Sequence, residues 1–112
     1  MELFAGMRVR DLEAARGFYD RLFGSAPAFF PNDEEAVWEV AEHRYVYALV
    51  DPARAGDGLV TLFAEDLDAV AAEISGRGLE PAERETYGNG VRKLVYRDPD
   101  GNELGIGGGP AG

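Results

Sequence analysis

Few side chains in this sequence have the chemistry of a nucleophile or of a soft metal ligand. The 112 residues include one histidine, His43, and no cysteine. The serines, Ser25 and Ser75, flank the ends of predicted helices, where capping or solvent exposure explains them. The glycines at 105 and 107–109 precede no helix, so they do not form a phosphate-binding loop. Disulfides, thiolate metal sites and nucleophilic catalysis are therefore not expected.

Carboxylates are numerous, and the net charge is −10. Glu35, Glu39 and Glu42 fall on a predicted strand edge and turn, and we interpret them, with His43 beside Glu42, as solvated surface groups. The negative field repels nucleic acid and anionic membranes and attracts cationic partners. The sequence shows no secretory signal and no apolar run long enough to span a membrane, which predicts a cytoplasmic protein.

A repeat organises the chain. Residues 4–15 resemble residues 59–72, and the alignment places Asp11 on Asp66 half a chain length later. The repeat predicts a single domain of two related modules. Module one covers about residues 1–50, a linker 51–58, module two about 59–107, and a tail 108–112.

Each repeat reads as a short strand followed by an amphipathic helix. The apolar residues that recur at helical spacing are Leu12, Ala15, Tyr19 and Leu22 in module one, and Leu67, Val70, Ala71 and Ile74 in module two. Asp11 and Asp66 are predicted to cap the first turns, and Gly24 and Gly78 to adopt the left-handed conformation after the last turns.

Three strand-like runs follow each helix. The predicted strands are 26–30, 36–41 and 44–50 in module one, and 80–86, 91–96 and 103–106 in module two. The order βαβββ thus occurs twice and predicts an α+β fold with curved mixed sheets.

Two sets of residues carry a resemblance to a known family. They are Asp11-Leu12, Phe18-Tyr19 and Phe23-Gly24 around the first helix, and Asp98-Pro99-Asp100-Gly101-Asn102 before the last strand. With the repeat, they make the chain resemble, from about residue 3 to 107, the vicinal oxygen chelate superfamily of glyoxalase I, extradiol dioxygenases and bleomycin resistance proteins. The resemblance implies modules that curl into half-barrels and face one another around a cavity, and a homodimer with cavities near its interface.

The resemblance also implies where a metal would bind, because enzymes of this superfamily hold a divalent cation with His, Gln or Glu side chains. The corresponding positions here are Phe4, Leu59 and Gly105, none of which carries a ligand atom. Glu103, on the same strand face as Gly105, is the one alternative ligand and would need partners. We therefore predict no metal, no other cofactor and no catalytic residue.

Strand alternation predicts which residues line the cavity. Phe4, Gly6 and Arg8 should face inward in module one, and Leu59, Thr61 and Phe63 in module two. Tyrosines and the tryptophan on the remaining strands should contribute as well, although strand parity does not say which of them reach the cavity. The complete predicted ligand-binding set is Phe4, Arg8, Trp38, Tyr45, Tyr47, Leu59, Phe63, Tyr87, Tyr96 and Glu103.

The same aromatic side chains could instead close a core that holds no ligand. Arg8 separates the two interpretations, since an inward arginine needs a counter-charge. Pairing with Glu103 would make Arg8 structural, whereas an unpaired Arg8 would indicate an acidic group on the ligand.

Three functions are consistent with the sequence. The first is a non-catalytic protein, similar to the bleomycin resistance proteins, that sequesters a cationic or aromatic compound without metal and confers antibiotic resistance. The second is an enzyme of the same superfamily, a lyase or dioxygenase with a non-standard metal or acid-base site. The third is a regulatory or interaction module.

Overall fold

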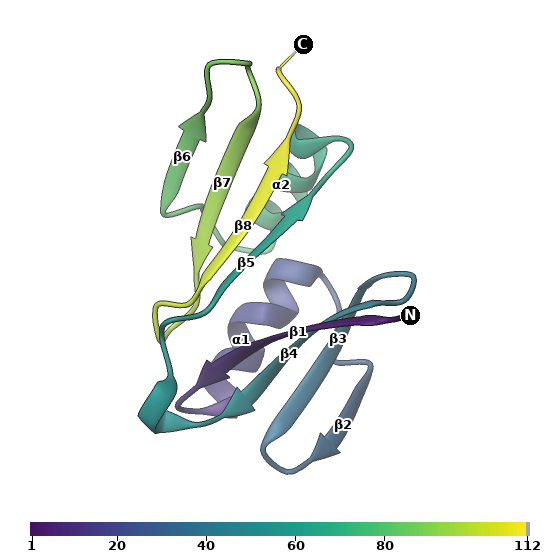
Figure 1. Cartoon of the computed structure of the whole chain (residues 1–112), viewed down its shortest axis with the longest axis vertical. Coiled ribbons are helices and arrows are strands. Elements are labelled where there is room, and N and C mark those ends of the chain that lie inside the picture. Colours follow the sequence, from purple (N-terminus) through teal and green to yellow (C-terminus); the bar gives the residue numbers. More distant parts are fainter. Residues whose placement is uncertain (112) are drawn as a thin grey trace.

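The computed structural model describes residues 1–111 and contains two βαβββ modules (Figure 1). Module 1 consists of β1 (Leu3–Val9), α1 (Leu12–Phe23), β2 (Phe29–Asn32), β3 (Glu35–Ala41) and β4 (Arg44–Val50). Module 2 consists of β5 (Leu59–Phe63), α2 (Leu67–Gly76), β6 (Glu83–Thr86), β7 (Arg92–Arg97) and β8 (Glu103–Gly108). A short 3-10 helix, Pro52–Arg54, lies in the connection between them.

The two modules share one sheet topology. The strand orders are β1-β4-β3-β2 and β5-β8-β7-β6. In each sheet the first pair of strands is parallel and the others are antiparallel. The α+β fold built from a repeated βαβββ unit is therefore confirmed.

Both helices begin where the sequence predicts. The Asp11 carboxylate accepts a hydrogen bond from the Glu13 amide at 3.2 Å, and the Asp66 carboxylate accepts one from the Ala69 amide at 3.0 Å. After α1, Gly24 adopts the left-handed conformation with φ 72°.

The boundaries of β3 and β7 differ from the prediction by one residue, and those of β2, β6 and β8 by more. β2 begins at Phe29 rather than at residue 26. β2 runs to Asn32 because Pro31, which has no N–H, is tolerated on an edge strand, and the Asn32 side chain accepts from the Glu34 amide to make the turn. β6 begins at Glu83 rather than Glu80. β8 continues to Gly108, the first residue of the predicted tail, which is buried. Residue 112 of that tail lies outside the described residues.

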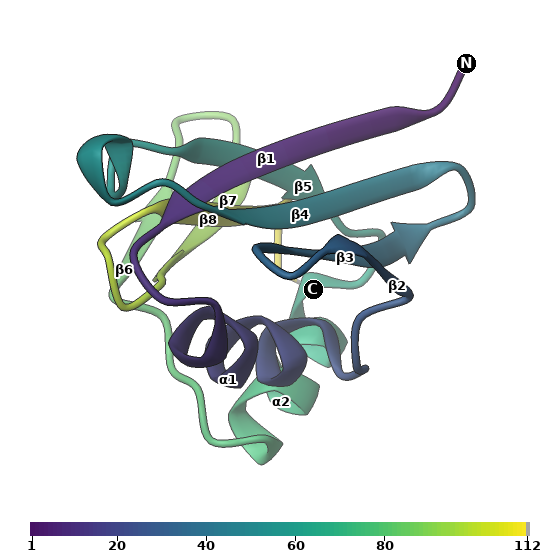
Figure 2. The same cartoon turned by 90° about the horizontal axis from the view of Figure 1, so that it is seen from below.

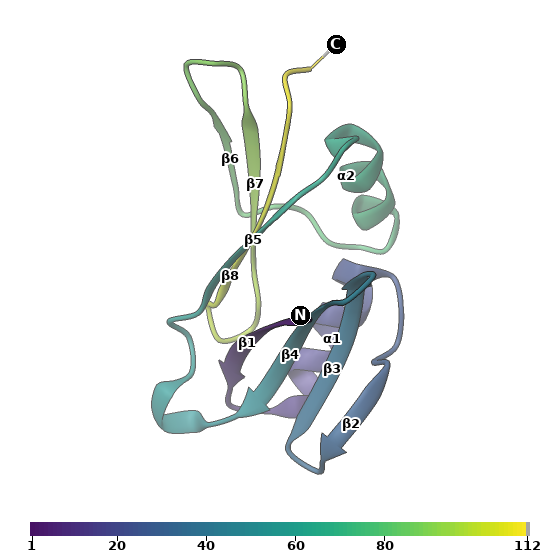
Figure 3. The same cartoon turned by 45° about the vertical axis from the view of Figure 1, so that its right-hand side comes forward.

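The helices occupy one side of the molecule and the sheets the other. Figure 3 shows the two modules following one another along the long axis, and Figure 2 shows α1 and α2 together beneath the sheets. We call the sheet surface that faces away from α1 and α2 the open face. Because both helices lie on the same side, the open faces of the two modules look in the same direction.

The core lies between the sheets and the helices and is continuous across the two modules. Its largest fully buried side chains include Trp38, Tyr19 and Met7 from module 1, and Tyr96 and Ile74 from module 2. Burial of this apolar surface supplies most of the stabilising free energy, at about 25 cal/mol per Å² removed from water. A shared core makes the two modules depend on one another for stability.

A polar cluster beneath the Asp98–Asn102 turn joins the modules. The fully buried Asn102 donates through Nδ2 to the Arg8 carbonyl and to the Asp98 carboxylate, both at 2.8 Å. Its Oδ1 accepts from the Gly58 amide at 2.7 Å. Asp98, itself buried, also accepts a 2.9 Å hydrogen bond from the Tyr19 hydroxyl of α1.

Arginines reinforce this joint at the surface. Arg10 contacts both carboxylate oxygens of Asp100, through its backbone amide at 3.0 Å and its guanidinium at 2.9 Å. At the other end of α1, Arg77 donates to the carbonyls of Arg21 and Leu22, where a cation complements the negative end of the helix.

Among residues 1–111, no helix is long and apolar enough to cross a membrane. The cytoplasmic location stays a prediction.

Asn102→Ala should destabilise the protein by about 2–4 kcal/mol, because it removes the hydrogen bonds that a fully buried side chain makes to the Arg8 carbonyl, the Gly58 amide and Asp98. The measurement is the urea midpoint of unfolding. Asn89→Ala is the matched control, since Asn89 is exposed and its side chain accepts one hydrogen bond, from the Val91 amide. Equal effects of the two substitutions would contradict the role of Asn102.

Alkaline pH should destabilise the protein through Tyr19. Burial, and then the Asp98 carboxylate, raise the pKa of Tyr19 far above its ordinary value. The stabilisation is complete below about pH 10, where an unfolded tyrosine is neutral, and falls above it as the unfolded state ionises. Tyr19→Phe should cost roughly 1–2 kcal/mol at neutral pH yet lose less stability than the wild type on going to about pH 11. Identical losses in urea unfolding would refute this assignment.

Candidate ligand-binding face

Alternation along β1 separates a buried side from an exposed one. Met7 and Val9 point toward α1 and are fully buried, whereas Phe4 on the open face is 46% exposed. Phe4, Gly6 and Arg8 therefore lie on the open face, as the alternation predicts. Strand pairing places them beside Tyr45, Tyr47 and Leu49 of β4, respectively.

Aromatic rings cover the open face of module 1. The rings of Phe4 and Tyr45 stack with centroids 4.5 Å apart and planes 12° apart, and Phe29 approaches the edge of Tyr45 at 6.3 Å. The Tyr47 ring lies over Gly6, in space that any larger residue would occupy. Gly6, Arg8, Tyr47 and Leu49 also line a small pocket of about 60 Å³. The arrangement offers flat apolar surface next to hydrogen-bonding groups.

The electrostatic surroundings of Tyr45 keep its hydroxyl protonated. Its hydroxyl donates to Glu2 at 3.2 Å. Partial desolvation and the neighbouring carboxylates of Glu39 and Glu2 raise the pKa of Tyr45 above its ordinary value. At neutral pH, Tyr45 is therefore a neutral aromatic donor.

Arg8 follows neither of the two alternatives that the sequence left open. Its guanidinium pairs with Asp51 in the module connection, with Nε 3.2 Å from the carboxylate, and its side chain is half exposed. Glu103 instead pairs with Lys93 at 3.2 Å and Arg97 at 3.4 Å. Sequence reasoning missed the Asp51 partner because the path of the connection depends on the tertiary fold.

The open face of module 2 combines apolar and charged groups. Leu59 and Phe63 of β5 are 66% and 69% exposed, with Thr61 between them. Glu103 of β8 lies beside Leu59 in the pairing of the two strands. Tyr87, just after β6, is half exposed and donates to Glu85 at 2.7 Å, and that carboxylate raises the pKa of Tyr87.

Trp38 and Tyr96 do not reach the open face, which corrects their place in the predicted lining set. Trp38 is fully buried on the helix side of β3, and its Nε1 donates to Asp20 of α1 at 2.8 Å. Tyr96 is buried on the helix side of β7, and its hydroxyl has no partner within residues 1–111. Both positions follow from strand parity, which a sequence does not define across turns of uncertain length.

The residues at the expected metal positions do not fit a divalent cation. Phe4 and Leu59 are exposed carbon side chains, and the space above Gly105 is crossed by the Lys93 side chain. Glu103, the alternative ligand, is engaged by two cations. His43 lies in an exposed turn with φ 61° between Glu2 and Glu42. Within the described chain, no three His, Cys, Asp or Glu residues are grouped to hold a metal.

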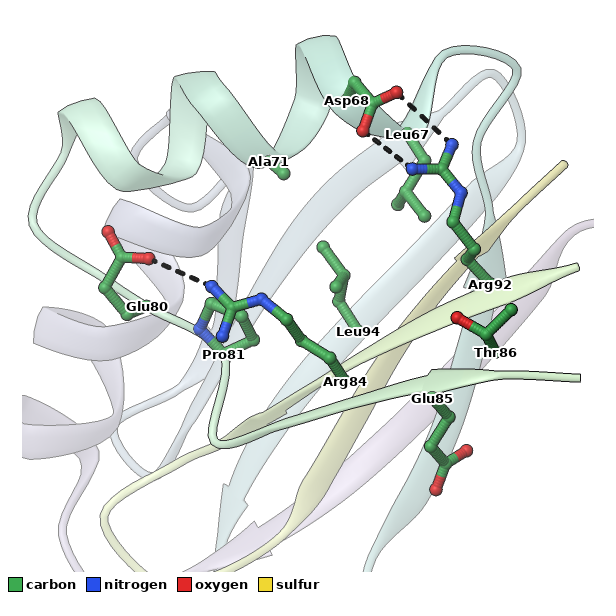
Figure 4. A pocket seen from close by; sticks show the side chains of 10 residues that line it. All are labelled: Leu67, Asp68, Ala71, Glu80, Pro81, Arg84, Glu85, Thr86, Arg92 and Leu94. Carbon is green, nitrogen blue, oxygen red and sulfur yellow. Dashed lines mark hydrogen bonds and ion pairs between the residues drawn. The ribbon is translucent and has the colours of Figure 1, made fainter. Parts of the chain in front are cut away.

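A cleft of about 230 Å³ opens on the helix side of module 2, between α2 and the β6–β7 edge (Figure 4). Its apolar residues are Leu67, Ala71, Pro81 and Leu94. Ion pairs frame it: Arg92 binds both oxygens of Asp68, which lowers the pKa of that carboxyl, and Arg84 lies 3.7 Å from Glu80. Because these charged side chains are already paired with one another, they are less available to a ligand than the aromatic side chains of the open face.

Two features of the site escaped sequence reasoning. Lys93 is absent from the predicted ligand-binding set. It is the only lysine in the chain, and this rarity is the signal in the sequence that could have identified it. Asp98 and Asn102 were recognised as turn residues, while their buried role between modules depends on contacts with Tyr19, Arg8 and Gly58 that are distant in sequence.

Comparison with solved structures places the chain among known folds. A glyoxalase/bleomycin resistance protein from Catenulispora acidiphila has 48% sequence identity and a TM-score of 0.93, with 98% of this chain and 99% of that chain covered. A lactoylglutathione lyase from Agrobacterium tumefaciens has 21% identity and a TM-score of 0.78, covering 97% and 93%. A bleomycin resistance determinant encoded on transposon Tn5 has 18% identity and a TM-score of 0.74, covering 96% and 97%.

Curated protein sequences gave no significant match. The model of one family, described as the Glyoxalase/Bleomycin resistance protein/Dioxygenase superfamily, matches residues 3–106. Together with the repeated βαβββ topology and the 48% identical structure, this match is decisive. The chain belongs to the glyoxalase/bleomycin resistance protein/dioxygenase superfamily.

Proposed function

We propose that the protein binds and sequesters a small aromatic compound on its open face, without a metal. The observation that carries the proposal is the exposed stack of Phe4 on Tyr45, with Phe29 at its edge. Large apolar side chains gathered on one face of a protein mark an interaction surface. A planar ligand fits such a surface by stacking on the rings.

A second copy of the chain completes the site in this proposal. The open faces of the two modules look to the same side, so they cannot enclose a ligand between them within one chain (Figure 2). A partner related by a two-fold axis would place its module 2 over module 1, and the reverse. Leu59 and Phe63 would then cover the ring cluster of the other chain, which consists of Phe4, Tyr45 and Phe29.

The overall charge favours a ligand that is cationic as well as aromatic. A net charge of −10 per chain attracts cations over long range and speeds their encounter with the protein. Relatives described as bleomycin resistance proteins share the fold, which supports an antibiotic as the ligand and resistance as the outcome.

Ligand binding should raise the melting temperature of the wild-type protein. At about a hundredfold excess over Kd, a ligand adds about 2.7 kcal/mol, which shifts Tm by several degrees in a domain of this size. We expect this shift with cationic aromatic antibiotics of the bleomycin type, and none with Mn²⁺, Fe²⁺, Ni²⁺ or Zn²⁺. A rise with one metal alone would favour an enzyme, and no rise with any compound would favour a regulatory module.

Phe4→Ala should remove the shift that the antibiotic causes, because it deletes one ring of the stack. Phe30→Ala is the matched control: Phe30 is also about half exposed, but its ring lies under the Arg16 guanidinium at 5.1 Å, on the helix side. If both variants keep the full antibiotic shift, the ring cluster is not the binding site.

The protein should sediment as a dimer, with the open face as its interface. Phe63→Asp places a charge on that face and should yield a monomer, whereas Phe30→Asp should leave the dimer intact. Analytical ultracentrifugation reads both states directly. A wild-type monomer, or dissociation by Phe30→Asp alone, would rule out this interface.

A further inference from the structure

We propose that Lys93 binds an oxygen group of the ligand, a carboxylate, phenolate or carbonyl, at the place where metal-dependent members of the family use a cation. This inference rests on the proposed function and specifies the ligand chemistry at the module 2 half of the open face. It starts from the disagreement between the expected metal positions and the residues found there.

Gly105 leaves an open place in the middle of the sheet, and Lys93 occupies it. A Cβ at position 105 would collide with Cε of Lys93 and would lie 3.3 Å from both the Lys93 Nζ and the Thr61 Oγ1. The lysine stem therefore covers the bare backbone of β8, and two hydrogen-bond donors border the same small space. A carboxylate side chain at position 105 could not coexist with this lysine conformation.

The ammonium group of Lys93 has N–H donors that are not used within the protein. Its one hydrogen bond within residues 1–111 goes to Glu103 at 3.2 Å, whereas an ammonium group has three N–H donors. Glu103 is shared with Arg97, which also pairs with Glu83 at 3.2 Å, so the four side chains together carry no net charge and what Lys93 offers a ligand is its unused N–H donors. The Lys93 side chain is about one fifth exposed, which is enough for contact with a ligand.

Apolar side chains lie beside the Lys93 ammonium and would strengthen its hydrogen bond to a ligand. Leu59 and Phe63 flank Thr61 on β5, and Phe63 lies over Gly107. A ring resting on these side chains would exclude water from the ammonium, and charge-assisted hydrogen bonds are stronger where water is excluded. A fixed cation here repels a divalent metal and attracts an oxygen atom with negative charge. The favoured ligand is therefore a flat aromatic molecule that carries such an oxygen near Lys93, in addition to the cationic group, elsewhere on the molecule, that the overall charge of the protein favours.

The test uses benzoate, benzamide and benzamidine, which share one ring and differ in the charge of the substituent. Because Lys93 is the only lysine, protein made with lysine labelled by ¹³C at Cε gives a single lysine signal. Titrations at physiological salt screen the distant acidic groups, since the Debye length there is about 8 Å. The readouts are the lysine signal and the backbone amide signals of the open face.

Benzoate should bind with a Kd about tenfold below that of benzamidine, and should move the Lys93 signal. Lys93→Met, which keeps the stem and loses the charge, should abolish this preference, while Lys93→Arg should retain part of it. Arg84→Met makes the same change in charge on the helix side of the same sheet and should leave the preference unchanged.

Binding of benzamidine in preference to benzoate, or a Lys93 signal that stays still while open-face amides move, would overturn the role of Lys93. The proposed aromatic site would survive that outcome. If none of the three probes moves any open-face signal, the proposed function fails as well. The labelled wild-type protein alone distinguishes these outcomes, so the test does not depend on the folding of any variant.

Discussion

The buried Asn102 side chain sets the relation between the two modules on which the rest of the structure depends. One amide group is bonded to the Arg8 carbonyl of β1, to Asp98 and to the amide of Gly58 before β5. Buried polar groups must be paired, so this set of bonds allows few other arrangements of the two sheets. Asp98 adds α1 to the same cluster through Tyr19, which fixes one end of the contact between α1 and the turn before β8.

That arrangement explains why apolar residues occur on both faces of the strands. On the helix side, Met7, Trp38 and Tyr96 are buried in a core shared by both modules. On the open face, Phe4, Leu59 and Phe63 are left exposed, although each would be stabilised by burial. A single chain cannot cover this second apolar surface because its two helices are already used on the other side, and this supports a role in binding.

Most of the arginines near these surfaces form ion pairs or hydrogen bonds that stabilise the fold. Arg10 holds Asp100 across the modules, Arg92 holds Asp68 at the start of α2, and Arg77 caps α1. Exposed pairs of this kind contribute little stability individually, so their effect is chiefly on orientation. Lys93 differs from them in lying on the open face beside a glycine, with donors left over after its contact with Glu103.

The sequence by itself determined the local structure and much of the candidate site. The helical spacing of apolar residues predicts both helices, and the capping residues Asp11 and Asp66 predict where they start, because these signals act over one or a few turns. Alternation along β1 and β5 likewise places Phe4 and Leu59 opposite the buried side. The tertiary structure alone decided that Trp38 and Tyr96 are core, that Arg8 pairs with Asp51, and that Lys93 crosses Gly105. Those outcomes depend on strand register and on residues brought together from distant parts of the chain, and no local pattern encodes them.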